Sequence, residues 1–262
     1  ILIPNWKAKS TTASPLKIFC SCPFIDPSPD HSTFSRFRKR LSKEAMDQIN
    51  SEILRQFENE GLKINEGIAI DARLVKSASR PLRNDEINKL REKKDTPEGK
   101  LDKNGKPLKF SRDLDSDCVV IKDEPHYGLK EHASVDTNHG FVLATTLSPA
   151  SEHDTNYFQY CTVYSRRTKQ SIKVAYGDKG YAGKPNREFL TLNKISDGIM
   201  RKDSTTAKLT EYEINRNKTI SKFRYIVEQY FGISHLHDRA KRARFTTISK
   251  NKVDCWYRQA AF

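Results

Sequence analysis

Residues 67–77 read Gly67-Ile-Ala-Ile-Asp71-Ala-Arg-Leu-Val-Lys-Ser77. The apolar and β-branched side chains over 68–75 predict a strand, because they suit a pleated and half-buried backbone. Asp71 stands in the middle of this run, where a charged side chain is unusual. Taken alone, the residue is explained by an edge strand whose acid faces water. Its importance depends on the elements that surround the strand.

The segments that follow predict a mixed α/β domain. Strand patterns cover 127–135 and 141–147, and the turn-rich residues 136–140 between them predict a hairpin. Further strands are expected at 172–176 and 195–200, and helices at 157–164, capped by Asp154, and at 187–192. The last helix is expected at 219–231, where Gly232 should end it. This order predicts a sheet with both antiparallel and parallel strands.

The region before the first strand divides in two. Five prolines within residues 1–30 interrupt any regular element, so we expect an irregular, degenerate N-terminal segment. Residues 31–62 predict a small helical segment, in which Ser42 caps a second helix and Gly61 ends it. Residues 63–262 are expected to form the main domain. It should contain a basic loop over 77–115, since 89–109 alone hold eight Lys and Arg.

The composition indicates a polyanionic partner. The 262 residues include 47 Lys and Arg against 33 Asp and Glu, which gives a formal net charge of +14. No run approaches the roughly 18 apolar residues of a membrane span, and no secretory signal is visible. The five cysteines are scattered and odd in number, which argues against a disulfide framework and for a reducing compartment. Nucleic acid is the commonest polyanion inside a cell.

Three acidic residues stand out by their context. Asp71 lies in the apolar strand, Asp178 follows the 172–176 strand in a glycine-flanked turn, and Glu228 lies on the last predicted helix. Ligands of open α/β sheets gather beyond strand ends. Three carboxylates brought together repel one another and resist desolvation, so a structure that holds them needs a cation. Hard oxygen ligands suit Mg²⁺ or Mn²⁺, and such ions support phosphodiester chemistry.

Each of these residues also has a simpler explanation. Asp178 can hydrogen-bond its own turn, as Asp often does beside Gly. Arg224 and Glu228 can form an ordinary helical ion pair, worth roughly a few tenths of a kcal/mol. Residue spacing alone does not choose between these explanations and a shared metal site. The histidines and cysteines have no spacing that requires zinc.

Five blocks of the chain, in order, resemble bacterial insertion-sequence DDE transposases. The three catalytic blocks of that family are similar to residues 67–77, to Tyr176-Gly-Asp178-Lys-Gly-Tyr-Ala-Gly183 and to Arg224-Tyr-Ile-Val-Glu228-Gln-Tyr-Phe-Gly232. Residues 127–136 and 147–154 resemble its hairpin and the loop after it. The resemblance implies an α/β fold: an RNase H-like mixed sheet flanked by helices, after a small helical N-terminal segment. It makes residues 31–62 part of an N-terminal DNA-binding region and residues 63–262 the catalytic domain. It implies Asp71 on the first strand, Asp178 after the fourth and Glu228 on a late helix.

The resemblance also implies chemistry. It assigns Asp71, Asp178 and Glu228 as catalytic residues and as ligands of two Mg²⁺ (or Mn²⁺) ions. By the same resemblance, these ions serve first to hydrolyse transposon ends and then to join the ends to target DNA. Partners would be the terminal inverted repeats and target DNA, with a homodimer as an assembly on DNA. No membrane partner is expected, and the location would be the bacterial cytoplasm, at the nucleoid.

Positive charge is concentrated late in the chain. Residues 201–262 hold 14 Lys and Arg against six Asp and Glu, and their densest cluster is Arg239-Ala-Lys-Arg-Ala-Arg244. The family often carries a Tyr, Arg, Glu, Lys signature around its glutamate, and here Ser221 replaces the Tyr and His235 replaces the Lys. Contacts to DNA phosphate give affinity without sequence readout. The residues expected to make them are Lys130, Lys179, Lys202, Arg224, His235, Arg239, Lys241, Arg242 and Arg244.

These observations lead to one main hypothesis and two alternatives. The main hypothesis is a DDE transposase that cuts and joins DNA with the three carboxylates. A metal-dependent nuclease on the same fold would cut without joining. A truncated, non-catalytic remnant of a mobile element would bind DNA only, and the irregular N-terminus, Ser221 and His235 agree with that alternative.

Overall fold

The structure is a computed structural model, and it describes residues 30–64, 66–81, 83–95, 113–166, 172–204, 207–237 and 240–261. The chain splits into two compact units, Ile1–Ile49 and Asn50–Phe262. The irregular segment expected over residues 1–30 lies almost wholly outside the described residues. The candidate site lies entirely in the second unit.

The helical segment forms as the sequence predicts. α3 (His31–Arg40) begins at Asp30, whose carboxylate accepts a hydrogen bond from the Thr33 amide at 2.8 Å. α4 (Lys43–Asn59) is capped by the Ser42 hydroxyl, which accepts from the Ala45 amide at 3.2 Å. Gly61 follows with a positive φ of 83°, a conformation that favours glycine at a helix end. A DNA-binding role for residues 31–62 stays a prediction.

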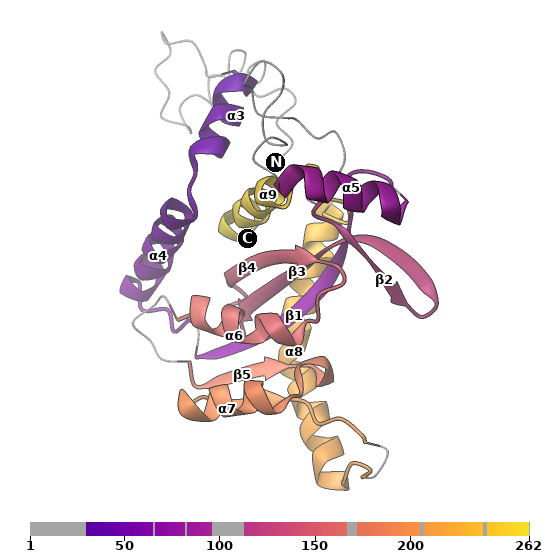
Figure 1. Cartoon of the computed structure of the whole chain (residues 1–262). Helices are drawn as coiled ribbons and strands as arrows, with labels where there is room; N and C mark the ends of the chain where they lie inside the picture. Colours follow the sequence, from indigo (N-terminus) through magenta and orange to yellow (C-terminus); the bar gives the residue numbers. More distant parts are fainter. Residues whose placement is uncertain are drawn as a thin grey trace. The chain divides into compact units, whose positions relative to one another are not determined.

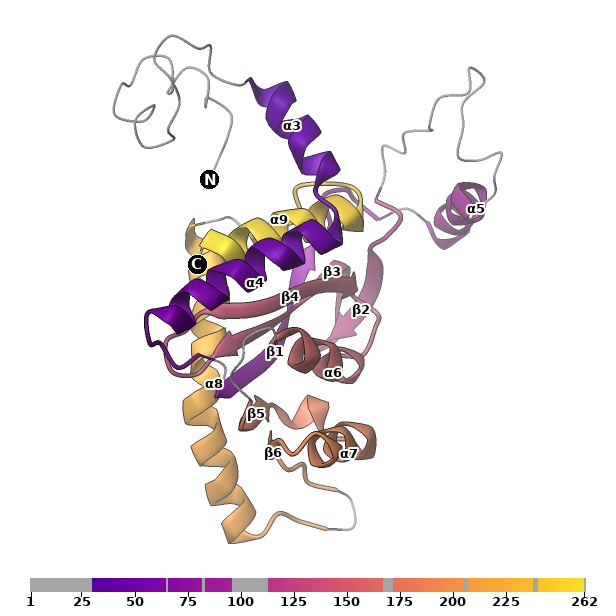
Figure 2. The same cartoon turned by 90° about the vertical axis from the view of Figure 1, so that its left-hand side faces the viewer.

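The second unit is built on a mixed sheet (Figures 1 and 2). The strands are β1 (Gly67–Lys76), β2 (Asp117–Ile121), β3 (Glu124–Asp136), β4 (Val142–Pro149), β5 (Val174–Gly177) and β6 (Ser196–Ile199). β1 pairs antiparallel with β3, and β3 pairs antiparallel with β2 and β4. On its other edge β1 pairs parallel with β5, which pairs parallel with β6. This topology confirms the expected RNase H-like mixed sheet.

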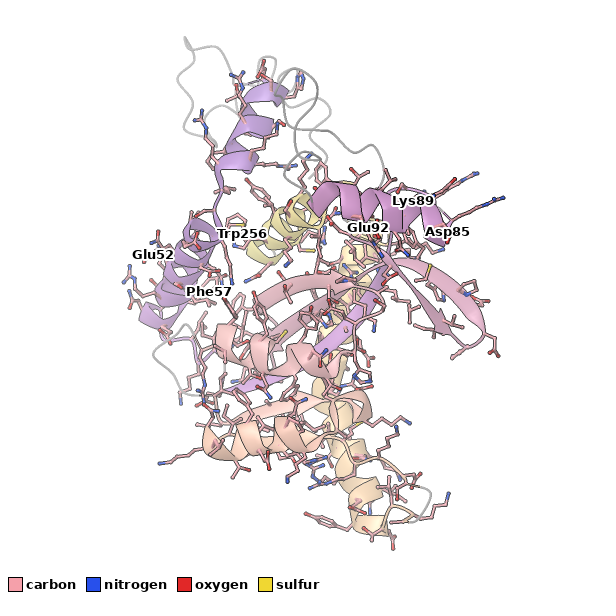
Figure 3. All side chains as sticks on the ribbon, in the orientation of Figure 1. Glu52, Phe57, Asp85, Lys89, Glu92 and Trp256 are labelled. Carbon is pink, nitrogen blue, oxygen red and sulfur yellow. The ribbon has the colours of Figure 1, made fainter. Side chains whose placement is uncertain are left out.

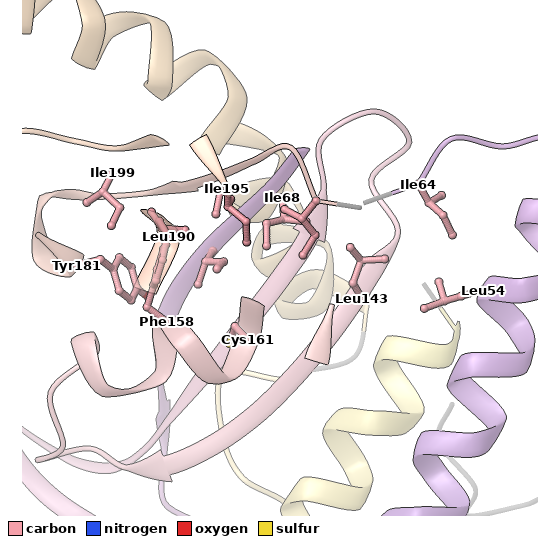
Figure 4. Close-up of a cluster of buried hydrophobic side chains, with 13 residues drawn as sticks. Leu54, Ile64, Ile68, Leu143, Phe158, Cys161, Tyr181, Leu190, Ile195 and Ile199 are labelled. Carbon is pink, nitrogen blue, oxygen red and sulfur yellow. The ribbon is translucent and has the colours of Figure 1, made fainter. Parts of the chain in front are cut away.

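Helices cover both faces of the sheet. Figure 2 shows α8 (Glu211–His237) on one side of β1, and α6 (Thr155–Tyr164) and α7 (Lys184–Leu192) on the other. The alternation along β1 explains this: Ile68 and Ile70 join a core cluster with α6 and α7, shown in Figure 4, whereas Ala69 packs with residues of α8. The side chains at 69, 71 and 73 therefore share the face that α8 covers.

Several predictions need correction. α8 continues five residues beyond Gly232, whose Cβ position is open, so this glycine does not end the helix. Helix α6 begins two residues earlier than expected, at Thr155, and the Asp154 side chain makes no capping hydrogen bond but pairs with Lys130 at 3.0 Å. The basic loop expected over 77–115 contains a helix, α5 (Asn84–Asp95), and residues 96–112 lie outside the described residues.

Like α5, strand β2 and helix α9 (Ile248–Ala261) were not predicted; α9 packs on β4. Helix α5 has only a small apolar face. Asp85, Lys89 and Glu92, labelled in Figure 3, are exposed, and Ile87 is its buried apolar side chain among the residues whose burial is described. Because one or two apolar residues are a weak signal among so many charges, a loop was the natural prediction.

Candidate active site

Two of the predicted carboxylates lie next to each other at the end of the sheet where the parallel strand β5 finishes. In the parallel pair of β1 and β5, Ala69 is opposite Tyr176. Asp71 and Asp178 each come two residues later, so continuing this register sets them side by side at the carboxyl end of β5. Neighbouring strands lie about 5 Å apart. The prediction that Asp178 follows the fourth strand of the RNase H-like order agrees with its place directly after β5.

Helix α8 brings the third carboxylate to the same place. The Arg224 guanidinium donates a hydrogen bond to Asp71 Oδ2, with an Nη2–Oδ2 distance of 2.9 Å. The same Nη2 lies 4.0 Å from Glu228 Oε1. Arg224 is only 11% exposed, whereas Glu228 is 63% exposed. Arg224 therefore stands between Asp71 and Glu228 and holds the two elements together by charge.

The surroundings of Asp71 disfavour its charge. Burial raises the pKa of Asp71 to about 6, and the negative charges of Asp178 and Glu228 act in the same direction. Arg224 and the Ala72 amide, which donates to Asp71 Oδ1 at 2.9 Å, lower the pKa but do not offset the burial. At neutral pH Asp71 is therefore an ionised carboxylate whose charge the protein satisfies incompletely.

The simpler explanations given above are true in part. The Gly180 amide donates to Asp178 Oδ1 at 2.6 Å, so Asp178 does stabilise its own turn. The Arg224–Glu228 separation of 4.0 Å is at the limit of an ion pair. Within the described ranges, no group of three or more His, Cys, Asp or Glu side chains is arranged to hold a metal ion. Arg224 supplies the positive charge between the acids in this arrangement.

Aromatic side chains form the wall of the site. Tyr176, two residues before Asp178, stacks on Phe223 of α8 with a centroid distance of 4.7 Å and an interplanar angle of 8°. The Tyr181 hydroxyl is buried without a hydrogen-bond partner among the described residues. Burial raises the pKa of Tyr181, and the charges of Asp71 and Asp178 add to the rise. An unsatisfied hydroxyl beside two carboxylates is a place where a bound group or water would find a partner.

Comparison with known proteins identifies the family. A family profile described as "Transposase DDE domain" matches residues 66–261, which cover the whole sheet and helices α5 to α9. The chain belongs to the DDE transposase family. The resemblance read from the five sequence blocks is thereby confirmed.

A curated relative and a solved structure show how far the likeness extends. The chain is 31% identical over 226 residues to the transposase for insertion sequence element IS1106 of Neisseria meningitidis serogroup B, covering 83% of this chain and 71% of that protein. The crystal structure of the Mos1 mariner paired end complex with Mn aligns with 85% of this chain at 11% identity and a TM-score of 0.27. The alignment spans 63% of that solved chain, less than two thirds of its length.

A buried charged network anchors the site of this DDE transposase. The Arg73 guanidinium donates to Glu131 Oε2 of β3 at 2.6 and 3.0 Å, and to the Phe231 carbonyl of α8 at 3.0 Å. The Tyr230 hydroxyl donates to Glu131 Oε1 at 2.9 Å, and Arg258 of α9 donates to Oε2 at 3.4 Å. Burial raises the pKa of Glu131, but Arg73 and Arg258 together hold it below its ordinary value.

This network ties together β1, β3, α8 and α9. Arg73 is two residues from Asp71, and Phe231 is three residues from Glu228, so the contacts fix the strand and helix that carry two of the candidate ligands. Sequence reasoning missed this network. The sequence held one indication of it. Arg73 and Glu131 are charged residues inside predicted strands, as Asp71 is.

The residues expected to contact DNA fall into two groups. Lys179, Lys202 and Lys241 are exposed, and Lys241 lies beside the end of β1. Others are engaged within the protein. Lys130 donates to the Glu152 carbonyl at 2.7 Å, Arg242 donates to the Ser77 carbonyl at 2.9 Å, and Arg244 pairs with Asp254. Arg239 lies outside the described residues.

His235, at the position of the family's Lys, is half-buried. Burial lowers the pKa of His235, and the charges of Arg73 and Lys241 lower it further. The ring is therefore neutral at pH 7 and does not supply the permanent positive charge of a lysine.

None of the helices in the described ranges has the length and apolar character that a membrane crossing needs.

Proposed function

We propose that the chain is the transposase of an insertion element, which cuts the ends of the element and joins them to target DNA. The observation that carries this proposal is the parallel register of β1 and β5, because it sets Asp71 beside Asp178 at the edge where α8 presents Glu228. The family supports the reaction class, and the insertion-element relative supports the kind of DNA substrate.

The chemistry of the three donors suits a divalent cation, although in the described residues the side chains are not gathered around one position. Asp71, Asp178 and Glu228 offer hard carboxylate oxygens, and Asp71 carries a charge that Arg224 only partly satisfies. These three residues would hold one or two Mg²⁺ or Mn²⁺ ions. Such ions, when bound, lower the pKa of a nucleophilic water or 3′-hydroxyl and stabilise the leaving oxygen of a phosphodiester.

The chain's own residues would orient the DNA. Lys179 follows Asp178 directly and is exposed, so it can contact a phosphate next to the reacting one. Arg224 now pairs with Asp71, and a cation bound to Asp71 would free its guanidinium for a phosphate oxygen. We propose that the protein acts on the bacterial nucleoid in the cytoplasm, as a homodimer on DNA.

The test uses full-length protein, Mg²⁺, and linear DNA that carries the ends of the element together with its genomic flanks. We expect wild type to nick the ends and to join them to a supercoiled plasmid, and Asp178→Ala to do neither. Asp85→Asn serves as the matched control, since Asp85 is an exposed acid on α5. The mass of the protein–DNA complex gives the assembly state.

The outcomes separate the three hypotheses. Cutting without joining would identify a nuclease. DNA binding with equal, negligible activity in wild type and Asp178→Ala would identify a remnant and refute the proposal. An Asp178→Ala variant that stays as active as Asp85→Asn would remove Asp178 from the catalytic group even if the chain is a transposase.

A further inference from the structure

A basic groove lies on the surface formed by α7 and the segment after β6. It has a volume of about 890 Å³ and runs between α7 and the segment that follows β6. Its basic side chains are Lys184 and Arg187 of α7, and Arg201 and Lys202 after β6. Glu188 is the acidic residue among those that line it. The α7 and β6 elements are adjacent in Figure 2.

The charges around the groove are unbalanced. Asp197 of β6 lies close to three guanidiniums. It pairs directly with Arg187, and it lies 3.6 Å from Arg201 and 3.8 Å from Arg216. Burial lowers the pKa of Arg187, and the positive charges of Arg201 and Arg216 lower it further, against the effect of Asp197. One carboxylate therefore serves several cations, and an anion bound in the groove would relieve their mutual repulsion.

The cations of the groove are partly or largely exposed, and the ion pairs of Lys184 and Arg201 within the protein are long. Lys184 is 86% exposed, and its contact with Glu188 is a surface ion pair at 3.6 Å, which contributes little stability. Arg201 is 40% exposed, and Lys202 is exposed as well. α7 itself begins in this groove, at Gly183, and no side chain caps its first turn. A phosphate would meet side-chain cations and the positive end of a helix together.

The position of the groove follows from the sheet. Gly177 of β5 is opposite Ile199 of β6, so Asp178 and the segment that starts at Met200 leave the sheet at the same edge. β6 lies one strand from β5 and two strands from β1, so the segment after β6, which carries Arg201 and Lys202, leaves the sheet within about 10 Å of the strands of the carboxylates. Phosphates along one DNA strand advance about 3.4 Å along the helix axis, so this offset spans about two or three nucleotides.

We propose that this groove binds the sugar-phosphate backbone of DNA, two or three nucleotides from the phosphate that reacts. The proposal rests on the proposed function for its reference point, the reacting phosphate, but the binding itself does not depend on catalysis. The contacts are electrostatic, so they hold the strand in register without reading its bases. The same backbone chemistry could belong to the element's end or to target DNA.

Binding is measured with the full chain in the absence of divalent ions, by fluorescence anisotropy over a range of salt concentrations. One labelled duplex carries the end of the element, and a second has an unrelated sequence. The groove variant combines Arg201→Gln with Lys202→Gln. The matched control combines Lys250→Gln with Lys252→Gln, which removes the same charge from exposed positions on α9.

We expect the groove variant to bind at least fivefold more weakly than the control. We also expect its salt slope to fall by about 1 to 2, because each phosphate contact contributes about 0.9 to that slope. A loss on the end duplex only assigns the groove to the element's end, and a loss on both duplexes assigns it to DNA in general. A groove variant that binds like wild type, or a control that weakens equally, would overturn the proposal.

The location is tested with duplexes that carry one neutral methylphosphonate at each position in turn. A methylphosphonate at the phosphate that the groove contacts removes its charge. This change should weaken binding by wild type but not by the groove variant. We expect this position two or three nucleotides from the cut that wild type makes with Mg²⁺. A position more than five nucleotides away would refute the placement. If no cut is observed, the proposed function fails. The binding results still show whether the groove binds DNA.

Discussion

Neutralising Glu131 should destabilise the protein by about 3 kcal/mol. Glu131 is fully buried and accepts from Arg73, which is 7% exposed. Glu131→Gln keeps the shape of the side chain but leaves Arg73 without its carboxylate. Removing one member of a buried ion pair typically costs about 3–5 kcal/mol, because the remaining charge stays away from water. We expect the lower end, since Arg258 keeps Asp254 as a partner at 2.5 Å.

The chain offers a matched control. Glu52 and Arg55 of α4 have the same 2.6 Å separation as Arg73 and Glu131, but their side chains are 49% and 52% exposed. Glu52→Gln should therefore cost far less than Glu131→Gln, because water screens an exposed pair. The free energy of unfolding is measured by urea denaturation at pH 7 for both variants and wild type. A Glu131→Gln variant that loses no more than Glu52→Gln would refute the view that burial makes this pair important.

The same pair predicts a pH dependence. The pKa of Glu131 lies below its ordinary value of 4.5, because Arg73 and Arg258 stabilise the charged form. The stability that it contributes is present above pH 4.5 and is lost as the pH falls through the lowered pKa. The difference between wild type and Glu131→Gln should therefore be constant from pH 7 to about 5 and shrink below that. A difference that shrinks near neutral pH would contradict this assignment.

Other predictions concern the site and the packing. Without divalent ions, Asp71→Asn should stabilise the protein at pH 7.5 by on the order of 2 kcal/mol, because burial holds the pKa of Asp71 near 6 instead of 3.8. The gain should vanish below about pH 4, and Mg²⁺ should raise the melting temperature of wild type but not of the variant. Gly128→Ala should cost about 2 kcal/mol or more in urea denaturation, since its Cβ would lie 2.1 Å from a β1 carbonyl oxygen. Gly232→Ala, in open space within α8, should instead stabilise by about 0.5–1 kcal/mol. In peptide mapping after iodoacetamide treatment, the exposed Cys118 should react before the buried Cys161, whose pKa burial raises to about 12.

The elements that sequence predicted are those with a clear apolar period. β1, the β3–β4 hairpin, α4 and the middle of α8 all bury an apolar face, and a repeat of two or 3.6 residues reveals it. α9 buries a polar face. Asn251, Asp254 and Gln259 are all buried, and Gln259 donates to the Leu143 carbonyl at 3.0 Å. A helix held by such partners has no apolar period, so its sequence does not predict it.

β2 was missed for a related reason. It pairs with β3 alone, and its residues alternate between half-buried and exposed, with Val120 at 66% exposure. An edge strand of this kind gives a short and weak pattern. The end of α8 was misplaced because Gly232 is a frequent terminator, yet Ser234 beyond it is fully buried and continues the packing of the helix. In both cases tertiary contacts, which the local sequence does not express, decide the structure.

The contrast between two acids gives the best reason to place the chemistry at Asp71. Asp71 and Glu131 lie on neighbouring strands, on the face that α8 covers, and neither has free access to water. The protein satisfies Glu131 with Arg73, Arg258 and Tyr230, and its pKa falls. Within the part of the chain that the structure describes, Asp71 receives only Arg224 and one backbone amide, and its pKa rises to about 6. An acid that the fold satisfies holds the structure together. An acid that the fold buries beside two more carboxylates and leaves short of positive charge costs stability, and a cation bound there, as we propose, would offset that cost.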